Sequence, residues 1–174
     1  VMFPFLICHR SITQVIKMNR HSRVCANINL NAILYNMESM HQKINPETKI
    51  MAVVKADGYG HGAIPIAKEI EHLDYLYGYA VATVEEGLLL RRSGIRKPIL
   101  ILGYIFPDQY ETVIEAEIDP SVFTLEMAKE LSSAAEKVRK DCKIHFAVDT
   151  GMSRIGYQVT DESADEMAQI AKLP

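Results

Sequence analysis

The sequence contains no tryptophan, few aromatic residues and only three cysteines, and it has no excess of charge of either sign. Cys8, Cys25 and Cys142 are an odd number without C-x-x-C spacing, which argues against a disulfide framework or a zinc site. Free thiols of this kind favour the reducing cytoplasm. The net charge of -3 leaves no basic stripe, so we expect neither a nucleic-acid partner nor a bound metal.

The sequence also lacks an apolar run long enough to cross a bilayer. Residues 1–8 are apolar, but they include Pro4, no basic segment precedes them, and a span needs ~20 apolar residues. We therefore expect no membrane segment. Residues 1–17 are interpreted as an extension of doubtful origin, and residues 18–174 as a single unit of one domain's length.

Strand-like and helix-like segments alternate along the rest of the chain. Such alternation is typical of parallel βαβ units, although it does not distinguish a doubly wound sheet from a barrel. Strands are predicted at 24–28, 49–54, 75–82, 98–102, 119–123 and 143–149. Helices are predicted after Asn29, from Ala63, after the capping box Thr83–Glu86, and at 107–116, 125–140 and 162–172.

The most informative stretch begins with Lys55 at the end of the apolar strand predicted at 49–54. An amine attacks a carbonyl only when it is neutral, and a buried strand end favours the neutral form by desolvation. Lys55 is therefore the candidate catalytic residue, with Schiff-base chemistry as its expected role. On spacing alone, a solvated strand end is the alternative interpretation.

Alternating glycines follow the lysine at Gly58, Gly60 and Gly62. Without Cβ atoms they allow positive φ and close approach of the backbone to a bound group. The helix predicted from Ala63 offers N–H groups to a phosphate. Lysine, Tyr59 and a phosphate site together suggest pyridoxal phosphate.

Two segments resemble those of a known family. Val54–Gly62 (VKADGYGHG) is similar to the cofactor-attachment signature of bacterial alanine racemases, and Asp149–Gly156 (DTGMSRIG) is similar to that family's second diagnostic segment. The resemblance extends from Arg23 to the C-terminus. It implies an α/β fold, a partial (β/α)8 TIM barrel with about five of the eight strands, and an end before the family's C-terminal β domain.

The same resemblance implies a pyridoxal 5'-phosphate-dependent racemase that interconverts L- and D-alanine for peptidoglycan. It makes Lys55 the attachment point and one catalytic base, Tyr59 a donor to the cofactor phosphate, and Arg154 a ligand of the substrate carboxylate. The family forms homodimers in which the partner's C-terminal domain supplies the second base. We therefore expect residues 1–174 alone to be inactive.

Other residues are given structural roles, and two positions depart from the family. Asp57 is interpreted as a turn former and His61 as structural. Ala147 stands where many members have a lysine that orients the arginine, and Cys25 replaces a tryptophan. A serine-specific relative, some of which carry a membrane domain, and a non-catalytic pyridoxal phosphate-binding protein are the alternatives.

Overall fold

The structure is a computed structural model that describes residues 25–174. Residues 1–17, interpreted above as an extension, lie outside this range, as does Val24. Five strands form one parallel sheet, and they follow one another in chain order across it. They are β1 (Ile50–Val53), β2 (Leu76–Val81), β3 (Ile99–Ile101), β4 (Asp119–Val122) and β5 (His145–Phe146).

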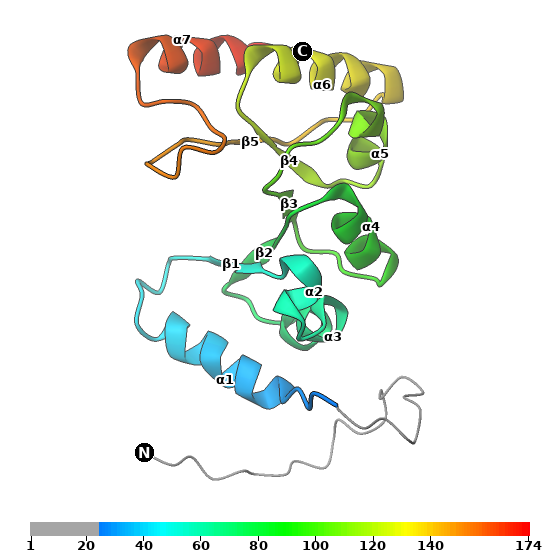
Figure 1. Ribbon diagram of the computed structural model, residues 1–174, viewed down its shortest axis with the longest axis vertical. Helices are drawn as coiled ribbons and strands as arrows, with labels where there is room; N and C mark the ends of the chain where they lie inside the picture. Colours follow the sequence, from blue (N-terminus) through cyan, green and yellow to red (C-terminus); the bar gives the residue numbers. More distant parts are fainter. Residues whose placement is uncertain (1–24) are drawn as a thin grey trace.

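Helices connect the strands, and α3, α4 and α5 follow one another along one side of the sheet (Figure 1). Four helices begin at an asparagine or threonine whose side chain accepts a backbone N–H of the first turn, as expected of N-caps. No helix within 25–174 is long and apolar enough to cross a membrane. The helices are α1 (Leu30–His41), α2 (Lys55–Tyr59), α3 (Ala63–Ile70), α4 (Val84–Arg92), α5 (Tyr110–Glu115), α6 (Leu125–Val138) and α7 (Asp161–Ile170), with a short 3-10 turn η2 (Pro107–Gln109).

The strand order settles the choice that the alternation left open. A doubly wound sheet reverses its strand order at a switch point, whereas here each strand pairs with the next from β1 to β5. Sequential parallel strands with helices between them are the arrangement of a (β/α)8 barrel. The fold is therefore a five-stranded part of such a barrel, as the sequence predicts.

Two predicted strands were wrong. Residues 25–28, the described part of the strand predicted at 24–28, form no strand and pair with no strand in the described part of the chain. The strand predicted at 143–149 is reduced to β5, which pairs with β4 through only two residues. Beyond it the backbone turns to pair with Tyr157, whose N–H donates to Ala147 and whose carbonyl accepts from Asp149.

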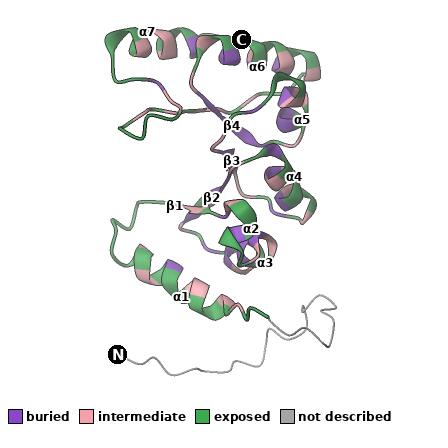
Figure 2. Cartoon of the chain, viewed as in Figure 1, coloured by how far each residue is buried: buried purple, intermediate pink, exposed green. Residues whose placement is uncertain are grey.

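Burial increases from the edge strand β1 toward the middle of the sheet (Figure 2). Every residue of β3 and β4 is buried, and the Tyr79 side chain in β2 is fully buried. The sequence predicted that β1 would be covered on both faces, but its residues are only half-buried and Val53 is 44% exposed. As an edge strand, β1 lacks a neighbour on one side.

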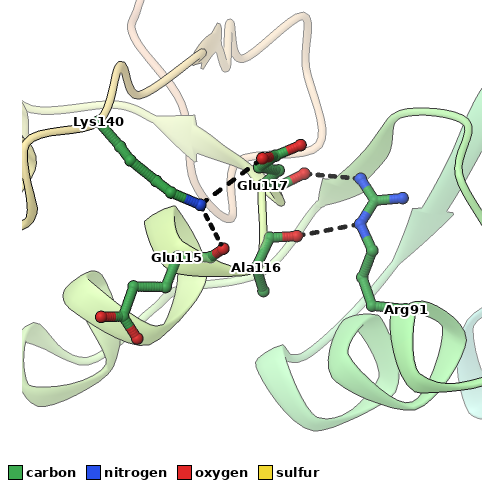
Figure 3. Close-up of polar contacts among 5 residues, drawn as sticks. All are labelled: Arg91, Glu115, Ala116, Glu117 and Lys140. Atoms are coloured by element: carbon green, nitrogen blue, oxygen red, sulfur yellow. Dashed lines mark hydrogen bonds and ion pairs between the residues drawn. The ribbon is translucent and has the colours of Figure 1, made fainter.

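Two basic side chains hold the C-terminal end of α5, where helix carbonyls lack helical partners (Figure 3). The Arg91 guanidinium donates to the carbonyls of Ala116 and Glu117 at 3.0 and 2.6 Å, and from α4 it also reaches two carbonyls that precede β3. The Lys140 ammonium donates to the Glu115 carbonyl at 3.0 Å. These bonds join successive βα units.

Candidate active site

Lys55 follows β1 after a single residue, so it lies at the carboxyl edge of the parallel sheet. Val54, between them, is buried, and its N–H donates to the Ala80 carbonyl of β2 at 2.9 Å. The strand pairing thus continues up to the lysine. Lys55 itself is half-buried. Active sites of barrels are built at this edge.

The short segment labelled α2 is a left-handed turn directly after Lys55, not a regular right-handed helix. Ala56, Asp57, Gly58 and Tyr59 have φ values of 50°, 51°, 63° and 56°. The sequence predicted positive φ only for the glycines, and Gly58, Gly60 and Gly62 have it. For the three residues with a Cβ atom this conformation costs about 1–2 kcal/mol each. Strain of this kind persists only where the surroundings hold it, and it is concentrated at functional sites.

Glu86, in the first turn of α4, holds the beginning of the left-handed turn. Its Oε1 accepts the Ala56 N–H at 2.6 Å, and its Oε2 accepts the Ala82 N–H at 2.7 Å. The predicted capping box is therefore only half formed. Thr83 accepts the Glu86 N–H at 3.4 Å, but the Glu86 side chain reaches Ala82 and the turn after β1 instead of the Thr83 N–H.

Asp57 and His61 hold the far end of the same turn. The Asp57 Oδ1 atom accepts the Ala63 N–H at 2.8 Å, and the His61 Nδ1 atom lies 3.1 Å from the Gly58 carbonyl oxygen. Both residues thus have the structural roles that the sequence indicated.

The expected phosphate cradle at the start of α3 does not form. Asp57 occupies the Ala63 N–H, Pro65 has none, and the Ile66 N–H donates to Gly62. Among these first positions of the helix, in the part that the structure describes, only the Ile64 N–H is left for a ligand. The Tyr59 side chain is 60% exposed on the left-handed turn, so its phenol is the more accessible donor.

Arg154 lies in the loop that follows β5, and Asp149 shapes this loop. The Asp149 Oδ1 atom accepts the N–H groups of Gly151 and Ser153 at 2.9 and 3.0 Å, while Oδ2 accepts from Gln158 at 3.1 Å. These bonds lower the pKa of Asp149. Arg154 is exposed and forms no ion pair among the residues described.

The three predicted site residues all follow the carboxyl ends of strands, but they do not form one cluster. Lys55 and Tyr59 share a turn after β1, which is the first strand of the sheet, whereas Arg154 follows β5, which is the last. Within 25–174 no hydrogen bond or ion pair links Arg154 to that turn. Ala147 offers only its backbone, which bonds Val122 and Tyr157, so nothing there takes over the orienting role of a lysine.

Comparison with known proteins identifies the family. The model of the family described as "Alanine racemase, N-terminal domain" matches residues 28–174. The chain belongs to the alanine racemase family. It is 43% identical over 158 residues to an alanine racemase of Clostridium novyi and 45% identical over 144 residues to alanine racemase 2 of Oceanobacillus iheyensis.

The chain spans about 40% of the length of these alanine racemases. The matches cover 90% and 82% of the chain, but 40% and 36% of the two relatives. A solved alanine racemase of Clostridium difficile superimposes with a TM-score of 0.82 at 37% identity, covering 84% of this chain and 38% of that structure. The resemblance therefore concerns the barrel part of the family.

A similar fold also occurs in a racemase named for a different amino acid. A histidine racemase of Leuconostoc mesenteroides superimposes with a TM-score of 0.75 at 24% identity, covering 84% of this chain and 39% of that structure. At this identity only the fold is shared. The fold of the alanine racemase family therefore does not by itself select the amino acid.

Proposed function

We propose that the chain is the N-terminal barrel part of a pyridoxal 5'-phosphate-dependent alanine racemase, which interconverts L- and D-alanine in the cytoplasm and supplies D-alanine to the cell wall. The observation that carries this proposal is the position of Lys55 and Tyr59 on one strained turn at the carboxyl edge of β1. Identity to alanine racemases of 43% and 45% supports it.

The residues of the turn fit pyridoxal phosphate. An aldehyde needs a primary amine, and Lys55 is half-buried at a strand end. A phosphate needs donors, and the exposed Tyr59 phenol lies four positions along the same turn. The side of Gly60 where a Cβ would lie faces open space, which leaves room for a bound group. When bound, pyridoxal phosphate stabilises negative charge on the α-carbon of an amino acid.

The chain's own residues would bind the cofactor, orient the substrate and move one proton. Lys55 would hold the cofactor, and its amine would take the Cα proton on one face or return it there. Tyr59 would donate its phenol hydrogen to the cofactor phosphate. Arg154, exposed and without an ion pair in the described chain, presents a planar fork to the substrate carboxylate.

The rest of the racemase is part of the same proposal. A homodimer would close each site with residues of the partner's C-terminal β domain, which supplies the proton carrier for the other face. The segment Asp149–Gly156 favours an enzyme over a non-catalytic cofactor-binding relative, because it is typical of the catalytic members.

Reduction with borohydride tests the attachment point. Protein incubated with pyridoxal phosphate and borohydride should carry the label on Lys55, and Lys55→Ala should lose it. Lys49 and Lys143 are matched controls, because they precede β1 and β5 and so lie at the opposite, amino edge of the sheet. Label on either control in place of Lys55 would contradict the proposal.

A further inference from the structure

Glu86 is the one side chain within 25–174 that connects the backbone directly after Lys55 to another βα unit. Its carboxyl group spans two backbone N–H groups, that of Ala56 after β1 at 2.6 Å and that of Ala82 after β2 at 2.7 Å. Each oxygen accepts one donor, the arrangement that suits a carboxylate. The side chain comes from α4, which begins directly after Ala82 and Thr83.

This connection acts where the chain is strained. The Ala56 N–H is the first donor of the left-handed turn, and Ala56 itself has a φ of 50°. The Val54 N–H is fixed to Ala80 on the strand side. Lys55 thus lies between two fixed amides, and its side chain leaves the backbone in a direction that both determine.

A purely helical role does not explain this geometry. A carboxylate in the first turn of a helix is favourable wherever it points. Glu85, the preceding residue in the same first turn, provides that charge, and its side chain accepts a hydrogen bond from the Gln109 side chain. The Glu86 side chain does not bond the Thr83 N–H, as a capping box would require. It accepts instead the N–H of Ala56, 30 positions earlier in the chain.

We propose that Glu86 is a positioning residue for Lys55, whose carboxylate holds the left-handed turn and so directs the lysine amine toward the cofactor. This rests on the proposed function, in which Lys55 binds pyridoxal phosphate. Glu86 acts through the Ala56 backbone and is not itself a catalytic residue.

Two measurements on the purified protein test this. The first is hydrogen exchange of the Ala56 and Ala82 amides without cofactor. The second is the labelling of Lys55 by pyridoxal phosphate and borohydride, at the cofactor concentration that half-labels the original protein. Glu86→Gln should speed hydrogen exchange at one or both of these amides about tenfold. The NH₂ group of the glutamine replaces one carboxylate oxygen, so one of the two backbone N–H groups loses its acceptor. Lys55 labelling should fall about tenfold with it.

Two control variants separate positioning from general destabilisation. Glu85→Gln removes the neighbouring charge and should change neither measurement. Tyr79→Phe removes the buried bonds of the Tyr79 hydroxyl to Ala67 and Glu71, away from the turn, and should leave Lys55 labelling within about twofold at an equal folded fraction. Labelling of Glu86→Gln within about twofold of the original, or an equal loss in Tyr79→Phe, would overturn the proposal.

The same data distinguish this inference from the proposed function. If Lys55 is never labelled in the original protein, the proposed function fails and with it the role toward the cofactor. Faster exchange in Glu86→Gln would still show that Glu86 holds the turn. If Lys55 is labelled but exchange at Ala56 and Ala82 is unchanged in Glu86→Gln, only the positioning role is lost.

Discussion

At the scale of single residues, backbone strain is concentrated directly after Lys55. Three residues with a Cβ atom, Ala56, Asp57 and Tyr59, have positive φ, at a combined cost of roughly 3–6 kcal/mol. Hydrogen bonds that the Glu86 and Asp57 carboxylates accept from backbone N–H groups offset part of it, since bonds to charged groups contribute about 1.5–3 kcal/mol each. Such a turn fixes the lysine more rigidly than a flexible glycine loop would.

Sequence reasoning found the residues of this turn but not its conformation. Lys55, Tyr59 and the glycines stand out by type and spacing. An alanine with positive φ does not, because the contacts that impose it come from residues distant in the chain, and Glu86 lies 30 positions from Ala56. The predicted phosphate cradle was wrong because the Asp57 side chain, six positions earlier, occupies the Ala63 N–H.

Replacing Arg154 tests its proposed contact with the substrate. In a protein of the relatives' full length, Arg154→Lys should raise KM for alanine about tenfold with a smaller effect on kcat, because a point charge cannot reproduce the bidentate fork. Arg92→Lys is a matched control on the exposed face of α4. Steady-state kinetics in both directions give the answer, and an unchanged KM would leave Arg154 without a substrate role.

Acid should loosen the Arg154 loop through Asp149. Hydrogen bonds from Ser153, Gly151 and Gln158 lower the pKa of Asp149 in the folded protein. Stability from a lowered pKa is present above the unfolded value of about 3.9 and is lost as pH falls through the folded value. Exchange of the Gly151 and Ser153 amides, corrected for intrinsic rates, should therefore accelerate below pH ~4. Asp149→Asn keeps acceptor oxygen but does not titrate, so the acceleration should vanish; if it persists, another group is responsible.

At the scale of elements, helices were predicted more closely than strands. Caps such as Asn29 and Thr83 act locally, so α1 and α4 begin where the sequence indicated. The length of a strand depends instead on its neighbours. β5 pairs only through His145 and Phe146, although the apolar pattern runs further, and residues 25–29 have no strand neighbour in the described chain.

Arg91 should be the residue that joins the elements most strongly. Its guanidinium donates to carbonyls at the end of α5, as Figure 3 shows, and also to carbonyls before β3. Removing it leaves several of these acceptors without a partner. Arg91→Ala should lower the free energy of unfolding by about 2–3 kcal/mol. The exposed neighbour makes a control: Arg92→Ala should change it by less than about 0.5 kcal/mol. Urea unfolding measures both, and equal losses would contradict the role of Arg91.

At the scale of the whole molecule, the sheet is open at both edges. β1 and β5 each pair with one neighbour only within 25–174, and β1, which leads to Lys55, is half-buried for that reason. The βα order is encoded locally and could be predicted, whereas the barrel was predicted from the resemblance of two segments to the alanine racemase family. The sequence did not predict how the site residues come together, because Lys55 follows one outer strand of the open sheet and Arg154 follows the other.

Residues 1–174 alone should therefore not racemise alanine, even when folded. Racemisation needs a proton carrier on each face of the α-carbon, and in the proposed function Lys55 serves one face. The carrier proposed for the other face belongs to the partner's C-terminal β domain, and this chain spans about 40% of its relatives' length. Losing one general acid or base costs about 10²- to 10⁴-fold in rate.

A coupled D-alanine assay with excess pyridoxal phosphate measures the turnover of the 174-residue chain. The matched control is the same assay on a chain extended to the relatives' full length. Turnover of the short chain within about tenfold of an ordinary enzyme's ~10 s⁻¹ would contradict the prediction. It would mean that a second proton carrier lies within residues 1–174, and Tyr157 would be the first to replace, since its buried hydroxyl has no hydrogen-bond partner among the described residues and lies on the loop that carries Arg154.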